Sequence, residues 1–368
     1  MSELFWGSVA VIAYVYAIYP LLIAAWARLR ARPVRRVPLG AAETGPAPGV
    51  SVVIAAHNEG RRLPARVRNL LAQQYPGPLQ IIVVSDGSTD STRAALAPFG
   101  NRVELVEIPR SGKPSALNAG VARAHHPLLL FADARQTFAP DVVRLLVENF
   151  ADPAVGAVTG ELLLDCEQGD DAVDSSMAES VGAYWRFEKW LRRHESAVWS
   201  TLGATGAVYA MRRSLWRPLP AATLLDDVLA PMRVVLAGSR VVFDERPKAF
   251  DRVERDAAGE RRRKVRTLAG NYQIVALEPA LLNPLRNRVW FQFVSHKLGR
   301  LAVPYAMVLA LVANAALAPA GILYMAALAA QLGFYGLAAY GWWLEKGARA
   351  EGRHAWRSRP GVLPETRS

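Results

Sequence analysis

The sequence has almost no cysteine, and this scarcity removes two kinds of site at the outset. Its 368 residues contain one cysteine, Cys166, and six histidines. An internal disulfide is therefore excluded, and the lack of a Cys/His cluster argues against a zinc site. We interpret Cys166 as a small buried side chain and expect a reducing compartment.

Acidic residues are also scarce relative to basic ones. Lys and Arg number 44 against 32 Asp and Glu, which gives a formal net charge of +12. Such an excess suits an anionic partner: nucleic acid, a phosphorylated substrate or a lipid surface. The basic residues concentrate beside uncharged apolar segments, where lipid accounts for them. We therefore expect membrane lipids as a partner and no nucleic acid.

Charge is absent altogether from two long stretches. Residues 4–27 carry no charge and are numerous enough to cross a hydrocarbon core of ~30 Å as a helix. Residues 301–344 carry none either, and the sequence APAG at 318–321 interrupts them, which predicts a helical hairpin. Basic residues follow the first stretch and flank the second, which predicts cytosolic outer ends. A buried soluble hairpin is the alternative, disfavoured because soluble helices seldom lack charge for so long.

These stretches divide the chain into six parts. We predict one N-terminal transmembrane helix with a basic flank, a linker rich in Pro, Ala and Gly, a cytosolic α/β domain, an interfacial helix, a transmembrane hairpin and a basic cytosolic tail. A plain solvated helix is the alternative for the fourth part. The parts are residues 1–32, 33–48, 49–282, 283–300, 301–345 and 346–368, in that order.

Within the cytosolic part, short apolar runs alternate with segments of helical period. This alternation predicts a mostly parallel, doubly wound sheet with flanking helices. Ligands on such sheets bind beyond the carboxyl ends of the strands. The expected strands are residues 49–57, 79–85, 102–108, 127–133 and 155–162, and the expected helices are 61–74, 91–99, 115–125 and 140–150.

The usual glycine motifs for nucleotides are missing at these strand ends. The turn after the first strand reads AAHNEG, without the dinucleotide glycines, and Glu107 stands where a phosphate-binding loop needs Gly. Acidic residues occur there instead, at Glu59, Asp86 and Asp133. Carboxylates can bind nucleoside hydroxyls and hold a divalent ion against a pyrophosphate. We interpret Asp90 as an ordinary helix-starting residue.

Six motifs occur in a fixed order: VSVVIAAHNEG, IIVVSDGSTDST, GKPSALNAG, FADAR, GATGAVYAMRR and LLDDV. In order and spacing they resemble the family 2 inverting glycosyltransferases of the GT-A fold. The likeness is greatest to the membrane-integrated branch that includes cellulose, hyaluronan and poly-N-acetylglucosamine synthases. It covers about residues 48–275, and the apolar flanks agree with it.

The resemblance implies a nucleotide-sugar donor, with uridine diphosphate as the family default. It implies that Glu59 and Asp86 contact the nucleoside and that Lys113 approaches the diphosphate. Asp133 matches the first residue of the family's DxD motif and would hold Mg²⁺ or Mn²⁺ and the phosphates. Arg266 matches the arginine of the QxxRW motif and would contact the phosphates, with anionic lipid as the alternative partner.

On the acceptor side, the resemblance implies that Asp227 is the base that deprotonates the attacking hydroxyl. An alcohol has a pKa far above 7, so it needs a carboxylate within hydrogen-bond reach. We expect Asp226 to face away, because adjacent helical positions are turned ~100° apart. The alternative is that LLDD merely caps the helix that follows. The segment 203–213 would lie beside the acceptor sugar, with Gly203, Gly206 and Tyr209 as its candidates.

Two motifs depart from the family's pattern. FADAR has Arg135 where a second Asp is common, so the metal would lose a ligand or Arg135 would neutralise part of the charge. RKVRT, residues 263–267, retains only the arginine of QxxRW, which puts processive polymerisation in doubt.

The leading hypothesis is therefore a membrane-anchored inverting glycosyltransferase in the plasma or inner membrane, with its catalytic domain in the cytosol. It would transfer a sugar to a lipid-linked or polysaccharide acceptor in cell-surface polysaccharide or glycolipid synthesis, and export or synthase subunits are candidate partners. The rival is a non-catalytic transferase-like subunit of a polysaccharide synthesis or export complex, which the two altered motifs motivate.

Overall fold

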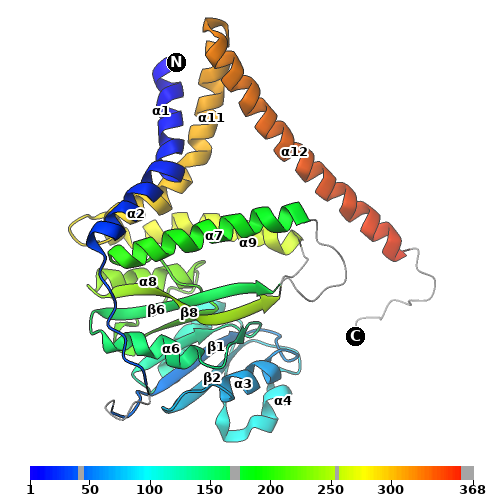
Figure 1. Cartoon of the computed structure of the whole chain (residues 1–368). Helices are drawn as coiled ribbons and strands as arrows, with labels where there is room; N and C mark the ends of the chain where they lie inside the picture. The colour runs from blue at the N-terminus through cyan, green and yellow to red at the C-terminus, as the bar shows by residue number, and fades with distance from the viewer. Residues whose placement is uncertain (40–44, 166–174, 253–256, 358–368) are drawn as a thin grey trace. The chain divides into compact units, whose positions relative to one another are not determined.

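The computed structural model describes residues 1–39, 45–165, 175–252 and 257–357 (Figure 1). Cys166 and the end of the predicted basic tail lie outside the described residues. The chain divides into two compact units, Val15–Leu301 and the remainder.

One eight-stranded sheet forms the centre of the larger unit, with the strand order β3-β2-β1-β4-β7-β6-β8-β5. β1, β2 and β4 are apolar runs whose residues are mostly buried because helices cover both faces, whereas the edge strand β3 is only partly buried. The strands are β1 Val50–Ala56, β2 Leu79–Asp86, β3 Glu104–Ile108, β4 Leu128–Ala132, β5 Thr137–Phe138, β6 Val155–Asp165, β7 Val208–Arg212 and β8 Arg240–Arg252.

The sheet is mixed rather than parallel throughout. β1, β2, β3 and β4 run parallel to one another, as the alternation of strands and helices predicts. β7 then enters antiparallel between β4 and β6, and the short β5 pairs antiparallel with β8. The reversal at β7 brings the motif GATGAVYAMRR next to the carboxyl end of β4, where FADAR stands.

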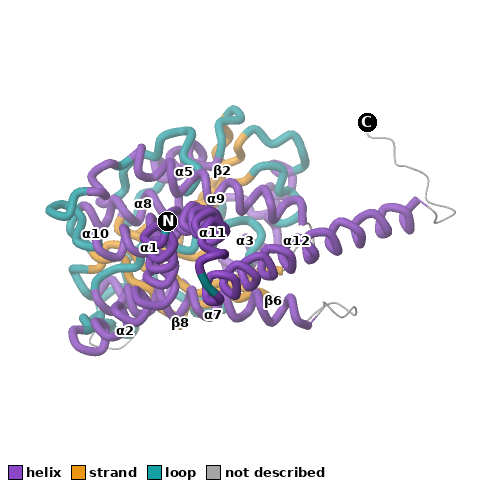
Figure 2. The backbone as a smooth tube through the Cα atoms, turned by 90° about the horizontal axis from the view of Figure 1, so that it is seen from above, coloured by secondary structure: helices purple, strands orange, loops and turns teal. Residues whose placement is uncertain are grey.

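Helices on both faces give the sheet two cores. One core combines apolar residues of α3 and α6 with one face of the strands, and the other combines α5 and α8 with the opposite face. Figure 2 shows these helices in purple around the orange strands. The helices of this unit are α2 Tyr19–Arg30, α3 Leu63–Leu71, α4 Thr92–Leu96, α5 Lys113–Arg123, α6 Val142–Glu148, α7 Ser175–Val198, α8 Asp226–Leu236, α9 Ala257–Leu277 and α10 Trp290–Gln292.

Three helical segments are long and apolar enough to cross a membrane: Ser2–Arg30, Trp290–Ala320 and Ile322–Leu344. The first combines α1 Ser2–Ala13 with α2 across a π-helical turn, Tyr14–Ile18. The other two contain α11 Gly299–Leu317 and the start of α12 Ile322–Arg357, separated by a short 3-10 turn at Ala318–Ala320. One N-terminal and two C-terminal apolar helices were predicted, and this part of the prediction is confirmed.

The segment 283–300 differs from the single interfacial helix that we predicted. Residues 283–289 form turns in which the side chain of Asn287 accepts a hydrogen bond from the backbone of Val289 and donates one to Leu281. Helix begins only at Trp290 and continues into α11. The turn-forming asparagines and Pro284 thus keep residues 283–289 out of the helix. The helix that begins at Trp290 is part of the apolar span.

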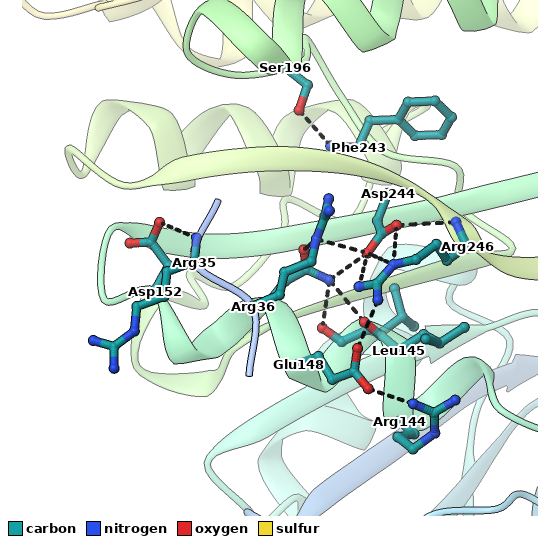
Figure 3. A network of polar contacts seen from close by, with 12 residues as sticks. Arg35, Arg36, Arg144, Leu145, Glu148, Asp152, Ser196, Phe243, Asp244 and Arg246 are labelled. Carbon is teal, nitrogen blue, oxygen red and sulfur yellow. Dashed lines mark hydrogen bonds and ion pairs between the residues drawn. The ribbon is translucent and has the colours of Figure 1, made fainter. Parts of the chain in front are cut away.

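The predicted linker is bound to the sheet domain along its described first half. The Arg36 side chain donates a 2.9 Å hydrogen bond to Asn149 and lies 3.5 Å from the buried carboxylate of Asp244 (Figure 3). Backbone groups of Arg35 and Val37 bond to the same part of the domain. Residues 33–39 therefore fix the end of α2 to the sheet domain, although their composition is that of a flexible tether.

Candidate functional site

The loops that follow β1 and β2 are joined to each other at the carboxyl edge of the sheet. His57 Nδ1 lies 2.8 Å from the carbonyl oxygen of Asp86, and the Asn58 side chain accepts a 2.8 Å bond from the Thr89 backbone. Asp90 accepts bonds from Gly60 and from Thr92, the first residue of α4, so it ties the two loops together. Ser91, not Asp90, occupies the N-cap position of α4. Glu59 pairs with Arg62 at 3.0 Å within the first loop. Hydrogen bonds within the protein thus hold the two loops at this edge of the sheet in place.

Asp86 holds the turn that leads into α5. Its side chain is 3% exposed and accepts hydrogen bonds from the backbone N–H groups of Ser111 at 2.6 Å and Gly112 at 3.1 Å. Arg110 pairs with the same carboxylate at 2.5 Å. Gly112 has φ +88°, a left-handed conformation in which glycine avoids steric cost. The arrangement makes Asp86 a residue that positions Lys113, the first residue of α5.

Lys113 brings together two acidic residues from distant parts of the sequence. Its Nζ lies 3.0 Å from Asp133 Oδ1, just beyond β4, and 3.5 Å from Asp226 Oδ2, at the start of α8. Lys113 is 38% exposed and Asp133 36%, so a ligand from solvent can reach both side chains. Burial lowers the pKa of Lys113, but the nearby carboxylates outweigh burial and raise the pKa above its usual value. Lys113 is therefore a permanent cation at this edge.

Asp226 is the residue that our sequence reasoning missed. We expected it to face away from the site, but it forms the ion pair with Lys113 and is 7% exposed. The ~100° turn between neighbours holds within a helix, whereas Asp226 and Asp227 open the first turn of α8, directly after the loop. The sequence feature that could have revealed the role of Asp226 was the pair of adjacent acidic residues at the start of a helix.

The loop before α8 is held by two side chains, which fixes where the helix begins. Asn118 of α5 makes a pair of 2.8 Å bonds with the backbone of Leu219. Gln273 of α9 accepts a 2.8 Å bond from the backbone of Leu224. The first turn of α8 is thus positioned by the same helix, α5, that carries Lys113.

Asp227 lies against the segment 203–206. Its backbone carbonyl accepts a 2.7 Å bond from Ala204, and a Cβ atom added to Gly206 would stand 3.0 Å from Asp227 Oδ2. A Cβ atom added to Gly203 would stand 3.3 Å from the Asp227 carbonyl oxygen. Gly206 therefore leaves room for the Asp227 side chain, and Gly203 leaves room for the Asp227 backbone.

The electrostatic environment of Asp227 suits a proton acceptor. Burial raises the pKa of Asp227 to about 6, and the charge of Asp226 adds to the rise. The charges of Lys113 and Lys297 oppose it. A carboxylate with a pKa near 6 is ionised at neutral pH and is more basic than an ordinary aspartate.

Three other residues that the sequence suggested have different surroundings. Tyr209 is fully buried on β7 and stacks on Phe131, so an acceptor cannot contact its ring. Arg266 is exposed on α9 and, in the described part of the chain, has no ion pair with the cluster around Lys113. Arg135 pairs with the buried Asp251 of β8 at 2.5 Å.

Carboxylates at this edge can share one cation. Within the described residues, no group of three or more His, Cys, Asp and Glu side chains is placed to hold a metal on its own. The Lys113 ammonium nevertheless shows that Asp133 and Asp226 reach a common positive charge. Magnesium and similar ions often take one or two carboxylates and complete their shell with substrate phosphates. The residues present fit a metal bound together with a diphosphate.

Comparison with known proteins is consistent with this geometry. A family described as "Glycosyl transferase family 2" matches residues 51–217. An N-acetylglucosaminyltransferase of Rhizobium leguminosarum bv. trifolii is 37% identical over 123 residues, which cover 32% of this chain and 68% of the relative. A poly-beta-1,6-N-acetyl-D-glucosamine synthase of Staphylococcus epidermidis is 29% identical over 137 residues, 36% of this chain and 33% of that protein. The chain therefore spans only about a third of this longer relative.

A solved structure resembles nearly the whole chain. The mannosyltransferase PcManGT from Pyrobaculum calidifontis, in complex with GDP-Man and Mn²⁺, has a TM-score of 0.69 and 23% identity, and the likeness covers 97% of this chain and all of that one. At this identity the likeness establishes the fold: a mixed α/β sheet of the GT-A kind with flanking and apolar helices.

Proposed function

Since this chain belongs to glycosyltransferase family 2, we propose that it transfers a sugar from a nucleotide donor to a carbohydrate acceptor at a membrane, with inversion at the anomeric carbon. The observation that carries the proposal is the meeting of Lys113, Asp133, Asp226 and Asp227 at one edge of the sheet. These residues come from three separate motifs, and together they supply a cation, carboxylates and a base.

On the donor side, Lys113 would bind the diphosphate. The leaving nucleoside diphosphate gains negative charge as the glycosidic bond breaks, and a fixed ammonium stabilises that charge. Asp86 would act by holding the turn 110–112 that positions Lys113. Glu59, on the adjacent loop, would contact the nucleoside. Asp133 and Asp226 would hold Mg²⁺ or Mn²⁺, which when bound would neutralise the diphosphate.

On the acceptor side, Asp227 would take the proton of the attacking hydroxyl. The hydroxyl oxygen forms the new bond to the anomeric carbon, the bond to the diphosphate breaks, and the proton passes to the Asp227 carboxylate. Its raised pKa of about 6 makes it a stronger base than an ordinary aspartate while leaving it ionised at pH 7. Gly203 and Gly206 would admit the acceptor sugar beside it, because neither carries a side chain.

The donor that we propose is a uridine diphosphate sugar, with N-acetylglucosamine as the first candidate. The names of the Rhizobium and Staphylococcus relatives support this sugar. The acceptor would be lipid-linked or a polysaccharide, and the protein would act in cell-surface polysaccharide or glycolipid synthesis.

The three apolar helices support a place in the plasma or inner membrane. Arg28 and Arg30 end the first of them, and Lys297 and Arg300 lie near the start of the second. By the positive-inside rule, these ends and the sheet domain would lie in the cytosol. Export or synthase subunits would be partners in that membrane.

The test is turnover by the purified full chain in lipid nanodiscs. We expect release of UDP from UDP-N-acetylglucosamine in the presence of a saccharide acceptor, and loss of that release in Asp227→Asn. GDP-mannose serves as the alternative donor. Donor binding without turnover by the native chain, with every acceptor and divalent ion supplied, would support the non-catalytic alternative instead.

A further inference from the structure

One face of α7 packs along the helix that begins at Trp290. Glu188, Arg192 and Glu195 stand at positions i, i+4 and i+7 of α7, which share a helix face. Glu195 accepts a 2.6 Å bond from the Tyr19 hydroxyl and lies 2.7 Å from His296 Nδ1. Glu188 pairs with Arg300. These contacts define a polar seam between α7 and the helix from Trp290.

Two cations of this seam have acidic neighbours only beyond ion-pair distance. Arg192 and Lys297 form no ion pair within 4 Å among the residues that the structure describes, and both are only partly exposed. Lys297 directly follows His296, and Arg192 stands between Glu188 and Glu195 on their common face. The two acidic residues of the seam make their short contacts with His296, Arg300 and Tyr19 instead.

This end of the seam reaches the proposed acceptor position. Arg192 Nη1 donates a 3.0 Å bond to Thr205 Oγ1. Thr205 is flanked by Ala204, which bonds the Asp227 carbonyl at 2.7 Å, and Gly206, which abuts the Asp227 carboxylate. The charge of Lys297 lowers the pKa of Asp227, so Lys297 also lies near this carboxylate. Both cations therefore stand close to the proposed base.

Cations that are partly withdrawn from water and have no acidic side chain within 4 Å favour a nearby anion. Removing charge from water is costly unless an opposite charge compensates it. The diphosphate of the donor is already assigned to Lys113, and the acids of the seam make their short contacts with other residues. An anionic group on the acceptor would meet this requirement. Lys297 also lies in the first turns of the candidate membrane span Trp290–Ala320, where a lipid chain can extend along apolar helices.

Building on the proposed function, we propose that Arg192 and Lys297 bind the phosphate of a lipid-linked acceptor, a saccharide joined to lipid through phosphate or diphosphate. A phosphate next to Asp227 places the attacking hydroxyl on a sugar close to the lipid, not at the distant end of a long polymer. The acceptor must then come from a reaction that joins a sugar to a lipid phosphate.

The test compares two probes that differ in phosphate. They are N-acetylglucosamine linked through diphosphate to farnesol, and the octyl glycoside of N-acetylglucosamine. Binding is measured to the full chain in phosphatidylcholine nanodiscs, with saturating UDP to block the donor site. We expect the native chain to bind the diphosphate probe at least about tenfold tighter, since a hydrogen bond to a charged group contributes a factor of this size.

Single variants separate phosphate binding from structure. Arg192→Gln and Lys297→Met should each weaken binding of the diphosphate probe about tenfold and leave the octyl glycoside unchanged. Arg193→Gln, at the exposed neighbouring position of α7, is the matched control and should behave as the native chain. Farnesyl phosphate should compete with the diphosphate probe but should not be glycosylated, because it carries no sugar hydroxyl.

Three results would overturn the inference. The native chain could bind both probes with equal affinity, or the variants could weaken binding of both probes equally. Alternatively, the only change in the variants could be that binding no longer depends on phosphatidylglycerol in the nanodisc. The last would assign the cations to bulk lipid. In each of these cases turnover of UDP-N-acetylglucosamine would persist with the octyl glycoside. Absence of turnover with both probes and of donor binding would instead overturn the proposed function.

Discussion

Lys113 Nζ donates a 3.0 Å hydrogen bond to Asp133 Oδ1, joining the start of α5 to the end of β4. The same ammonium lies 3.5 Å from Asp226. Lys113 and Asp133 are 20 residues apart in the sequence, and Asp226 lies about a hundred residues from both. A bound diphosphate would compete for the ammonium with these carboxylates. The relationship therefore sets both the affinity for the donor and the charge near the base.

Removing the Lys113 charge should weaken donor binding. In Lys113→Met we expect affinity for UDP to fall about tenfold to a hundredfold, because a charge-assisted hydrogen bond contributes about 1.5–3 kcal/mol. Isothermal titration calorimetry measures the change. Arg93→Gln, which removes an exposed ion pair with Glu107, is the control and should bind UDP normally. Unchanged affinity in Lys113→Met would place the diphosphate elsewhere.

Replacing the proposed base should separate catalysis from binding. In Asp227→Asn we expect kcat to fall by roughly 10²–10⁴-fold, the usual contribution of a general base. The dissociation constant for UDP should change little, because the amide keeps the shape of the carboxyl group. Steady-state turnover and calorimetry measure the two quantities. A variant that keeps most of its turnover would exclude Asp227 as the base.

The raised pKa of Asp227 predicts an acid limb in the pH profile. The base must be ionised, so kcat/KM should fall about tenfold per pH unit below about 6 and level off above it. The charge of Asp226 adds to the effect of burial in raising this pKa. Asp226→Asn should therefore move the midpoint to lower pH in whatever activity remains. A midpoint near 4 in the native chain would contradict the environment described for Asp227.

The same raised pKa predicts that Asp227 lowers the stability of the folded state while it supports activity. A carboxyl group whose folded pKa lies above its unfolded value binds protons more tightly in the folded state. The folded state therefore loses stability as pH rises from about 4 to about 6 and does not regain it above. Asp227→Asn should raise the free energy of unfolding at pH 8 by about 1 kcal/mol, and by less at pH 4. Denaturant melts at both pH values test the sign.

Much of the sheet could be predicted because its signals are local. The apolar runs of β1 to β4 and of β6 have the length and composition of buried strands, and the helices between them have clear period. The acidic residues at the ends of these strands were recognised for the same reason. The predicted strand 155–162 and helix 115–125 agree with β6 and α5 to within a few residues.

What could not be predicted depends on long-range pairing. β7 inserts antiparallel between β4 and β6, and nothing in its five residues specifies those neighbours. Tyr209 was placed beside the acceptor because its motif is there, but the pairing of β7 turns its ring into the core against Phe131. Arg135 was one candidate for neutralising charge beside Asp133, but its partner Asp251 lies 116 residues away on β8.

The Arg135 and Asp251 pair yields a further prediction. Asp251 is 4% exposed and is also bonded by Gln136 at 3.0 Å. Arg135→Asp would restore the aspartate that the family's motif has at this position. We expect it to destabilise the domain by about 3–5 kcal/mol, because it leaves a buried carboxylate without its cation. Adding Asp251→Asn should recover most of that loss. Thermal melts of the single and double variants measure the coupling, and an unaffected single variant would refute the structural role of Arg135.

The most direct test of the central claim is an experimental structure of Asp227→Asn with intact UDP-N-acetylglucosamine and Mn²⁺. The account predicts diphosphate oxygens within about 3 Å of Lys113 Nζ, with the anomeric carbon facing residue 227 and the loop at Gly206. A diphosphate bound away from this edge, with Lys113 still bonded to Asp133 and Asp226, would contradict it.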